Sequence, residues 1–193
     1  MEILDALPAR AGHFRLESGY HTDLWLGLDA LFVSPREIAP LISELAARIR
    51  PHGVTAVCGS LLGGAFLAQA LATDLGCEFY FSEPVASNSD AKMFSAEYRL
   101  PDPLRPRIRG RRVALVDDVI SAGSSVRATA VALAEAGATI AVVGALFVLG
   151  RIALDHFAAR SIPVESLGQR DFTLWEPSVC PLCAAAVPLE APR

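Results

Sequence analysis

The sequence has almost no lysine, no basic tail and no uninterrupted apolar run long enough to cross a bilayer. Lys92 is the only lysine among 17 basic residues, and the formal net charge is −4. This balance excludes proteins that bind nucleic acid through bulk positive charge, so we expect no nucleic-acid partner. Arginines that lie close together in the sequence, such as Arg109, Arg111 and Arg112, could still bind a phosphorylated small molecule.

Two uncharged stretches are the candidates for a membrane segment. Residues 136–150 are too short, because about 20 apolar residues are needed to span the hydrocarbon core. Residues 53–73 are long enough, but glycines, Ser60 and Gln69 interrupt them. Glu2 and Asp5 also make the first residues unlike a signal peptide. We expect no membrane partner and a cytoplasmic location.

The sequence has four cysteines. Cys58 and Cys77 fall in apolar, strand-like runs, which indicates thiols of the protein core. Cys180 and Cys183 form a lone C-x-x-C motif, whereas a zinc site normally has four ligands and no second C-x-x-C or H-x-x-x-H pair is present. A zinc ion shared between subunits and a redox pair both remain open, and we assign no side chain to a metal.

Apolar residues make up 52% of the 193 positions, which is enough for the core of one α/β domain. Strand-like and helix-like segments alternate, which favours a mostly parallel sheet flanked by helices. The polar residues 83–95 predict a mobile loop, the proline-rich residues 175–193 a coil-like tail, and Pro40 a kink or a later start of the first helix. We expect strands at residues 13–17, 23–29, 54–58, 77–81, 95–100, 112–117 and 138–149, and helices at 34–50, 64–74 and 124–136.

Residues 113–127 carry the pattern with the most chemical information. An apolar strand ends at Asp117 and Asp118, a Gly/Ser loop follows, and a helix begins at Ser124. Free N–H groups in such a loop can bind a phosphate, aided by the helix dipole. Carboxylates suit sugar hydroxyls or a hydrated Mg²⁺, so the combination indicates a phosphorylated ribose. A helix cap beside a surface charge is the alternative, while the lack of a lysine after the glycine disfavours a Walker A loop.

Residues 115–125 (LVDDVISAGSS) resemble the phosphoribosyl pyrophosphate signature of type I phosphoribosyltransferases. Residues 13–22, 57–64 and 175–190 narrow the resemblance to the short bacterial orotate phosphoribosyltransferases, and together it covers nearly the whole chain. The resemblance implies one domain over residues 1–193, with the type I α/β fold and a small N-terminal hood at residues 1–33. It also implies transfer of a phosphoribosyl group to orotate, giving orotidine 5-phosphate and pyrophosphate, with Mg²⁺ held mainly by substrate and water.

The resemblance also assigns roles to single residues. Asp117 and Asp118 would hold the ribose hydroxyls as catalytic residues. Arg151 would pair with the orotate carboxylate, and a solvated helix start is its alternative explanation. The 5-phosphate would contact Ser121, Ala122, Gly123, Ser124 and Ser125, and the pyrophosphate would lie along Gly59, Ser60, Gly63 and Gly64. The base would be covered by residues 14–19, with Phe14, Ser18 and Gly19, and His21, which replaces a lysine of the family, would also bind substrate.

The chain departs from the family pattern where pyrophosphate leaves. Ser82 and Glu83 stand where the family usually has Arg-Lys, and the long K-x-H loop is absent. We therefore predict that Lys92 is the mobile catalytic cation, with a solvated surface lysine as the alternative. The resemblance further implies a homodimer, in which the loop of one subunit covers the active site of the other. Another acceptor base, or a non-catalytic regulator that binds phosphoribosyl pyrophosphate, remains an alternative function.

Overall fold

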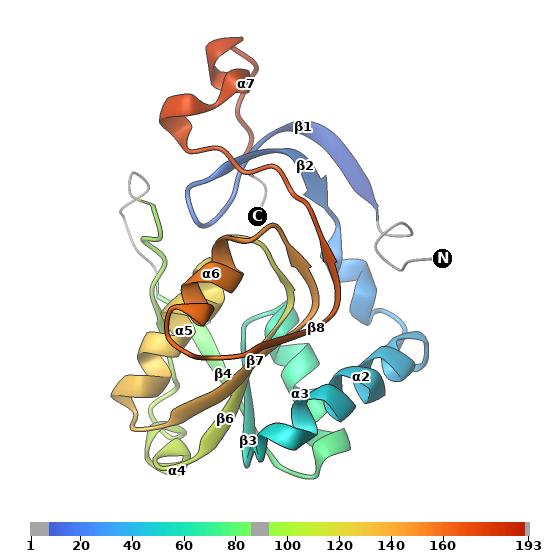
Figure 1. The fold of residues 1–193 in the computed structure, drawn as a ribbon, viewed down its shortest axis with the longest axis vertical. Coiled ribbons are helices and arrows are strands. Elements are labelled where there is room, and N and C mark those ends of the chain that lie inside the picture. The colour runs from blue at the N-terminus through green and yellow to red at the C-terminus, as the bar shows by residue number, and fades with distance from the viewer. Residues whose placement is uncertain (1–7, 86–92, 192–193) are drawn as a thin grey trace.

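The computed structural model describes residues 8–85 and 93–191, and its centre is a six-stranded sheet with the order β5-β4-β3-β6-β7-β8 (Figure 1). The short edge strand β5 pairs antiparallel to β4, and the other neighbours are parallel. This confirms the expected fold class. The strands are β3 (Ala56–Ser60), β4 (Glu78–Pro84), β5 (Tyr98–Arg99), β6 (Arg112–Ile120), β7 (Thr139–Leu149) and β8 (Val164–Arg170).

Helices cover both faces of the sheet. On one face lie α2 (Pro35–Ile49) and α3 (Gly63–Leu75), and on the other lie α4 (Arg105–Ile108), α5 (Ser124–Glu135) and α6 (Ile152–Ala158). Successive strand residues alternate between the two cores, as Ala114 packs with α2 and α3 while Leu115 packs on the opposite side. Because both faces are covered, β3, β6 and β7 are apolar almost throughout.

A separate two-stranded hairpin forms the hood. It consists of β1 (Ala9–Arg15) and β2 (His21–Leu26), and a 3-10 turn, η1 (Leu28–Phe32), leads from it to α2. Figure 1 shows the hood above the edge of the sheet where β6 and β7 end.

The C-terminal tail runs against both strands of the hood. Trp175 forms a bridge with His21, and Glu190 forms one with Phe14. Between these contacts the tail contains the short turns η3 (Pro177–Val179) and α7 (Pro181–Ala184), so it is not coil throughout.

The structure matches the expected elements except at several boundaries, at α4 in the middle of the chain and near the C-terminus. Helix α2 begins at Pro35 and continues through Pro40, so its start is not delayed. Strand β6 runs to Ile120, which places both aspartates within the strand rather than after it. The sequence analysis missed α4, α6 and β8, because α4 and α6 are short and β8 is a half-buried edge strand without strict alternation. In the part of the chain that the structure describes, no helix has the length and apolar character needed to span a membrane.

We predict that Leu133→Ala lowers the free energy of unfolding by about 2–5 kcal/mol, because it leaves a cavity in the core. Leu133 is 0% exposed on α5, whereas Val131 on the same helix is 59% exposed. The control Val131→Ala should change the free energy by no more than about 0.5 kcal/mol. Urea unfolding measures both, and equal losses would contradict the assignment of the buried face.

Candidate functional site

The motifs at residues 57–64 and 113–127 meet where the sheet strands end, because β3 and β6 are adjacent parallel strands. Gly59 lies in register with Val116, so the loop that follows β3 runs beside Asp117 and Asp118. The loop after β6 reaches the start of α5 within a few residues. Both motifs therefore lie at the edge that faces the hood.

Asp117 is a buried and firmly held carboxylate, with 7% of its surface exposed. One of its oxygens accepts hydrogen bonds from Ser60 Oγ (3.2 Å) and Ser125 Oγ (2.6 Å). The other accepts one from the backbone N–H of Asp118 (3.2 Å). Burial, and then the negative charge of Asp118, raises the pKa of Asp117 well above its ordinary value. The hydrogen bonds act in the opposite direction and fix the orientation of the group.

The segment after β3 can approach the carboxylates because Gly63 and Gly64, the first two residues of α3, have no side chain, and we call residues 59–64 the glycine loop. A Cβ atom on Gly63 would lie 2.2 Å from Asp118 Oδ2, and one on Gly64 would lie 2.6 Å from Asp117 Oδ1. A Cβ atom on Gly59 would lie 1.9 Å from the carbonyl oxygen of Gly64. No side chain fits at these distances, so the bare backbone of Gly63 and Gly64 packs directly on the aspartate pair.

The loop between β6 and α5 presents polar groups suited to an anion. Gly123 precedes α5 with a φ of +80°, the left-handed conformation that favours glycine. Ser124 Oγ is buried and has no hydrogen-bond partner among the described residues. A buried, unpaired hydroxyl at a helix N-terminus can donate to a phosphate oxygen, alongside the free N–H groups of the first turn.

A pocket of about 350 Å³ lies between this loop and the hood. Its volume is in the range of small-molecule sites. The sheet edge contributes Asp118 and the Gly/Ser loop, and the hood contributes mostly apolar groups. The lining residues are Leu16, Glu17, Ser18, Leu24, Trp25, Leu26, Gly27, Leu28, Asp118, Val119, Ile120, Ser121, Gly123, Ser124, Ser125, Leu149 and Phe172.

The structure brings most of the predicted site residues together. Ser18, Asp118, Ser121, Gly123, Ser124 and Ser125 line the pocket. Asp117, Ser60, Gly63 and Gly64 form the support behind it, packed on one another. Ala122 is buried and does not line the pocket, Gly59 packs on Gly64, and Gly19 forms the hairpin turn with a φ of +87°.

Three predicted substrate contacts lie elsewhere. Phe14 is 0% exposed and packs against Trp25, with ring centroids 6.1 Å apart, so it belongs to the core of the hood. His21 is buried against Cys183. Arg151 stands at the N-cap of α6 with its side chain 70% exposed, and it pairs with Asp155 at 3.5 Å. None of these three side chains lines the pocket, and the aromatic side chain that the hood contributes to it is Trp25.

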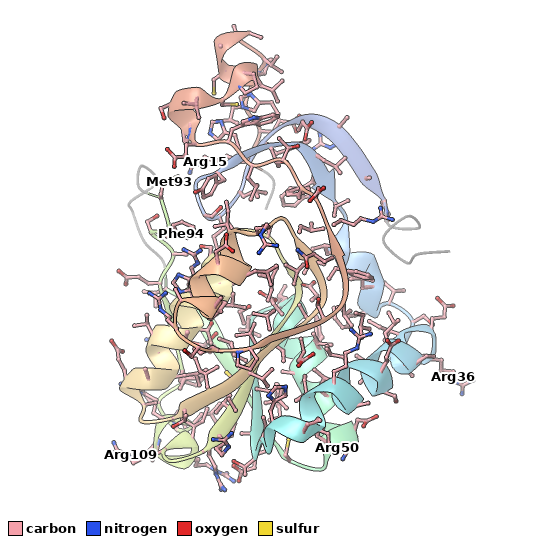
Figure 2. All side chains as sticks on the ribbon, viewed as in Figure 1. Arg15, Arg36, Arg50, Met93, Phe94 and Arg109 are labelled. Carbon is pink, nitrogen blue, oxygen red and sulfur yellow. The ribbon has the colours of Figure 1, made fainter. Side chains whose placement is uncertain are left out.

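The arginines at residues 109–112 lie at the opposite end of the sheet from the pocket. Arg112 begins β6, and Arg111 pairs with Glu78 at the start of β4. Figure 2 shows Arg109 at the end of the molecule far from the hood. These arginines therefore do not reach this pocket, because the Gly/Ser loop follows the other end of β6.

The segment around the predicted mobile loop lies beside the hood where the structure describes it. Lys92 lies outside the described residues. The backbone N–H of Phe94 donates to the carbonyl oxygen of Ser18 (2.9 Å), and the guanidinium of Arg127 stacks over the Phe94 ring at 4.1 Å. Figure 2 shows Met93 and Phe94 at the side of the hood. At the other end of the segment, Ser82 is buried against Thr129.

Sequence reasoning missed the apolar wall of the pocket and a cluster of His and Cys side chains. Trp25 and Phe172 line the pocket, but an isolated aromatic residue in a strand or coil gives no signal of that role. His13 and His21 lie beside Cys180 and Cys183. The signal was available in the two histidines that flank the hairpin turn, but their spacing matches no standard metal motif.

The sequence is similar to those of known phosphoribosyltransferases. The phosphoribosyl transferase domain family matches residues 33–155. The orotate phosphoribosyltransferase of Thermotoga maritima is 31% identical over 192 residues, which are 99% of this chain and 95% of that protein. The enzyme of the same name from Helicobacter pylori strain 26695 is 30% identical over 190 residues, 93% of this chain and 90% of that protein. This chain belongs to the orotate phosphoribosyltransferase family.

Solved structures show the same fold. A phosphoribosyltransferase from Corynebacterium diphtheriae superposes with a TM-score of 0.67 at 20% identity, over 87% of this chain and 92% of that chain. The orotate phosphoribosyltransferase of Mycobacterium tuberculosis superposes with a TM-score of 0.65 at 19% identity, over 87% and 93%. At such identities the likeness establishes the type I phosphoribosyltransferase fold.

The raised pKa of Asp117 predicts a cost in stability that depends on pH. The folded state holds the proton of Asp117 to higher pH than the unfolded state does. The free energy of unfolding therefore decreases as pH rises from the pKa of Asp117 in the unfolded state to its raised pKa in the folded state. We expect Asp117→Asn to be more stable than the parent at pH 8 and the difference to shrink as pH falls toward 4. Urea unfolding at several pH values measures it, with exposed Asp155→Asn as the control. A parent that is more stable than Asp117→Asn at pH 8 would contradict the assignment.

Proposed function

We propose that this protein transfers the phosphoribosyl group of phosphoribosyl pyrophosphate to orotate, producing orotidine 5-phosphate and pyrophosphate in pyrimidine synthesis. The observation that carries the proposal is that Asp118 and the Ser124 hydroxyl meet at one pocket, with Asp117 and the glycine loop packed directly behind them. Family membership supports the same reaction.

The donor binds at the sheet edge. Its 5-phosphate lies at the N-terminus of α5, where Ser121, Ser124 and Ser125 line the pocket and the helix dipole favours negative charge. Its ribose hydroxyls donate to the carboxylates of Asp117 and Asp118. The pyrophosphate lies along the loop from Gly59 to Gly64, where the backbone of Gly63 and Gly64 approaches the aspartates.

The residues present fit a hydrated Mg²⁺ ion. Asp118 lines the pocket, and a half-buried carboxylate is a suitable oxygen ligand for an ion that keeps several waters. Asp117 already accepts three hydrogen bonds, so it serves better to orient Asp118 and the ribose. When bound, Mg²⁺ would supply charge neutralisation at the pyrophosphate oxygens.

The reaction exchanges one bond at the anomeric carbon of ribose. The bond to the pyrophosphate oxygen breaks with its electron pair leaving on pyrophosphate. The orotate nitrogen forms the new bond from the opposite side, and its proton passes to the departing pyrophosphate or to water. The transition state resembles an oxocarbenium ion, so catalysis consists mainly of positioning the reactants and stabilising the departing charge. The hood holds the base under Trp25 and excludes water from the pocket.

Two cations complete the proposal. Arg151 recognises the orotate carboxylate, because a guanidinium binds a carboxylate with two parallel hydrogen bonds. To do so it must leave Asp155, its partner at 3.5 Å in an exposed pair that costs little to separate. Lys92 closes over the pyrophosphate as it leaves, from the segment whose described end contacts Ser18 of the hood.

The proposed assembly is a cytoplasmic homodimer. The exposed apolar side chains Val33 (82%), Leu62 (66%) and Phe66 (52%) support an interface near the glycine loop. Phe32 and Phe66 contact one another across the start of α2 and α3, with ring centroids 5.7 Å apart, which extends this apolar surface.

A specific observation favours a second candidate function. The side chains at Ser82 and Glu83 supply no positive charge, and Arg151 points away from the pocket toward Asp155. A protein with these features could bind phosphoribosyl pyrophosphate and use another base, or regulate without catalysis.

The release of pyrophosphate with a panel of bases separates these functions. We expect release with orotate and little with uracil or adenine, because only orotate offers a carboxylate to Arg151. Arg151→Ala should raise KM for orotate by about tenfold or more, and the matched exposed variant Arg160→Ala should not. Equal use of uracil and orotate by the parent would contradict the proposal, and no release with any base would favour the regulator.

A further inference from the structure

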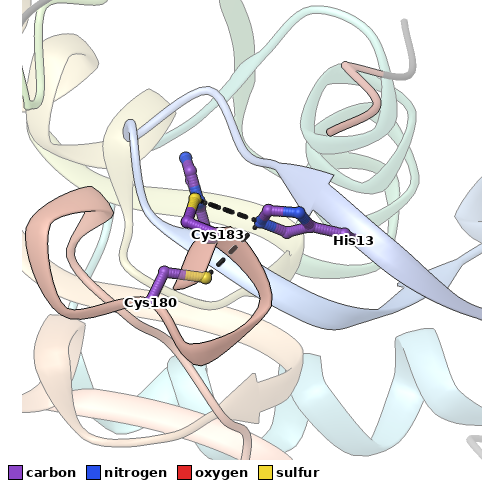
Figure 3. Close-up of side chains that lie close together, drawn as sticks. His13, Cys180 and Cys183 are labelled. Carbon is purple, nitrogen blue, oxygen red and sulfur yellow. Dashed lines mark hydrogen bonds between the residues drawn. The ribbon is translucent and has the colours of Figure 1, made fainter. Parts of the chain in front are cut away.

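A cluster of four side chains lies outside the pocket, between the hood and the C-terminal tail. His13 from β1 and His21 from β2 face Cys180 and Cys183 of the tail, and one ligand atom from each lies within 4.8 Å of all the others. Figure 3 shows the sulfur atoms of Cys180 and Cys183 pointing toward the ring of His13. His13, His21 and Cys180 are each at most 3% exposed.

Four of the six distances between these ligand atoms are close to the edges of a coordination tetrahedron. His13 Nε2 lies 3.1 Å from His21 Nδ1, 3.4 Å from Cys180 Sγ and 3.7 Å from Cys183 Sγ. Cys183 Sγ lies 3.3 Å from His21 Nδ1. With Zn–S bonds of about 2.3 Å and Zn–N bonds of about 2.0–2.1 Å, tetrahedral coordination gives edges of about 3.3–3.8 Å. Four of the six separations thus lie close to the edges of a closed coordination shell, and the other two are no longer than 4.8 Å.

Hydrogen bonding alone does not account for this convergence. His13 Nδ1 lies 2.9 Å from the carbonyl oxygen of Val187, which only accepts, so this contact favours the neutral tautomer with its proton on Nδ1 and its lone pair on Nε2. That single lone pair faces one nitrogen and two sulfur atoms. A carbonyl that holds the distant nitrogen of a histidine ring is also the usual support of a metal-ligating imidazole.

We propose that His13 Nε2, His21 Nδ1, Cys180 Sγ and Cys183 Sγ bind one zinc ion within a single chain. Two thiolates and two imidazoles in a tetrahedron suit Zn²⁺, and four protein ligands leave no open position, so the ion is structural rather than catalytic. This goes beyond the proposed transferase activity and does not rest on it.

The ion joins the tail to the hood at the point where both need support. Among the described residues, the tail meets the hood at two isolated bridges, Trp175 to His21 and Glu190 to Phe14, and through two side-chain contacts, His13 to the carbonyl oxygen of Val187 and an exposed ion pair of Arg10 with Glu190. The hood in turn is a two-stranded hairpin, which has marginal stability on its own. Residues 16–18, which lie between His13 and His21 in the chain, line the pocket. The zinc site therefore holds this wall of the pocket in place.

Metal analysis of the purified full-length protein tests the proposal. After expression with zinc and purification without chelator, mass spectrometry of the metals should find about one zinc per chain. Replacement by Co²⁺ should give the intense visible bands of tetrahedral thiolate coordination. Cys180→Ser combined with Cys183→Ser should lose the metal, whereas Cys77→Ser, outside the cluster, should keep it.

If the double variant fails to fold, the zinc content and the Co²⁺ spectrum of the parent protein still decide the question. A parent that holds no zinc and takes up no Co²⁺ would overturn the proposal. So would a Cys180–Cys183 disulfide in protein purified with a reductant, since that is the redox pair. About half a zinc per chain would overturn the single-chain site in favour of an ion shared between subunits.

Discussion

The site depends on one buried carboxylate at the edge of a parallel sheet. Asp117 is desolvated, lies beside a second aspartate, and is held by the hydroxyls of Ser60 and Ser125. Such a group is unfavourable unless its neighbours are fixed. The neighbouring strand supplies Ser60 and then a glycine loop that leaves space for the carboxylates, and the next helix supplies Ser125. A single electrostatic constraint therefore links β3, β6 and α5.

The second requirement is a wall that closes the pocket over this edge. The sheet cannot provide it, because the strands end there, and the hairpin β1–β2 performs that task from outside the central fold. Trp25 and Ser18 reach the pocket from one side of the hairpin, while His13 and His21 face the tail. The hood thus has two functions on its two sides: one shapes the pocket and the other anchors the structure.

Local patterns predicted the sheet edge well but the hood poorly. The strand, aspartate pair and Gly/Ser loop at residues 113–127 are contiguous, so their geometry follows from the chain itself. The roles of Phe14, His21 and Arg151 depend on which way a side chain points after folding. In the hairpin a shift of one residue moves every side chain to the other side, and the irregular register between Ala11 and Phe14 makes this shift invisible in the sequence. The His and Cys cluster joins residues far apart in the chain, which no spacing rule connects.

Calorimetric titration of phosphoribosyl pyrophosphate with Mg²⁺ into the parent and into a variant that combines Asp117→Asn with Asp118→Asn tests the central claim most directly. If the aspartate pair organises the site, the parent binds the donor and the variant binds it at least about tenfold more weakly, since it loses charged hydrogen bonds to the ribose. Circular dichroism of the variant verifies that it is folded. Equal affinity of the folded variant and the parent would show that the donor binds elsewhere and would contradict the account.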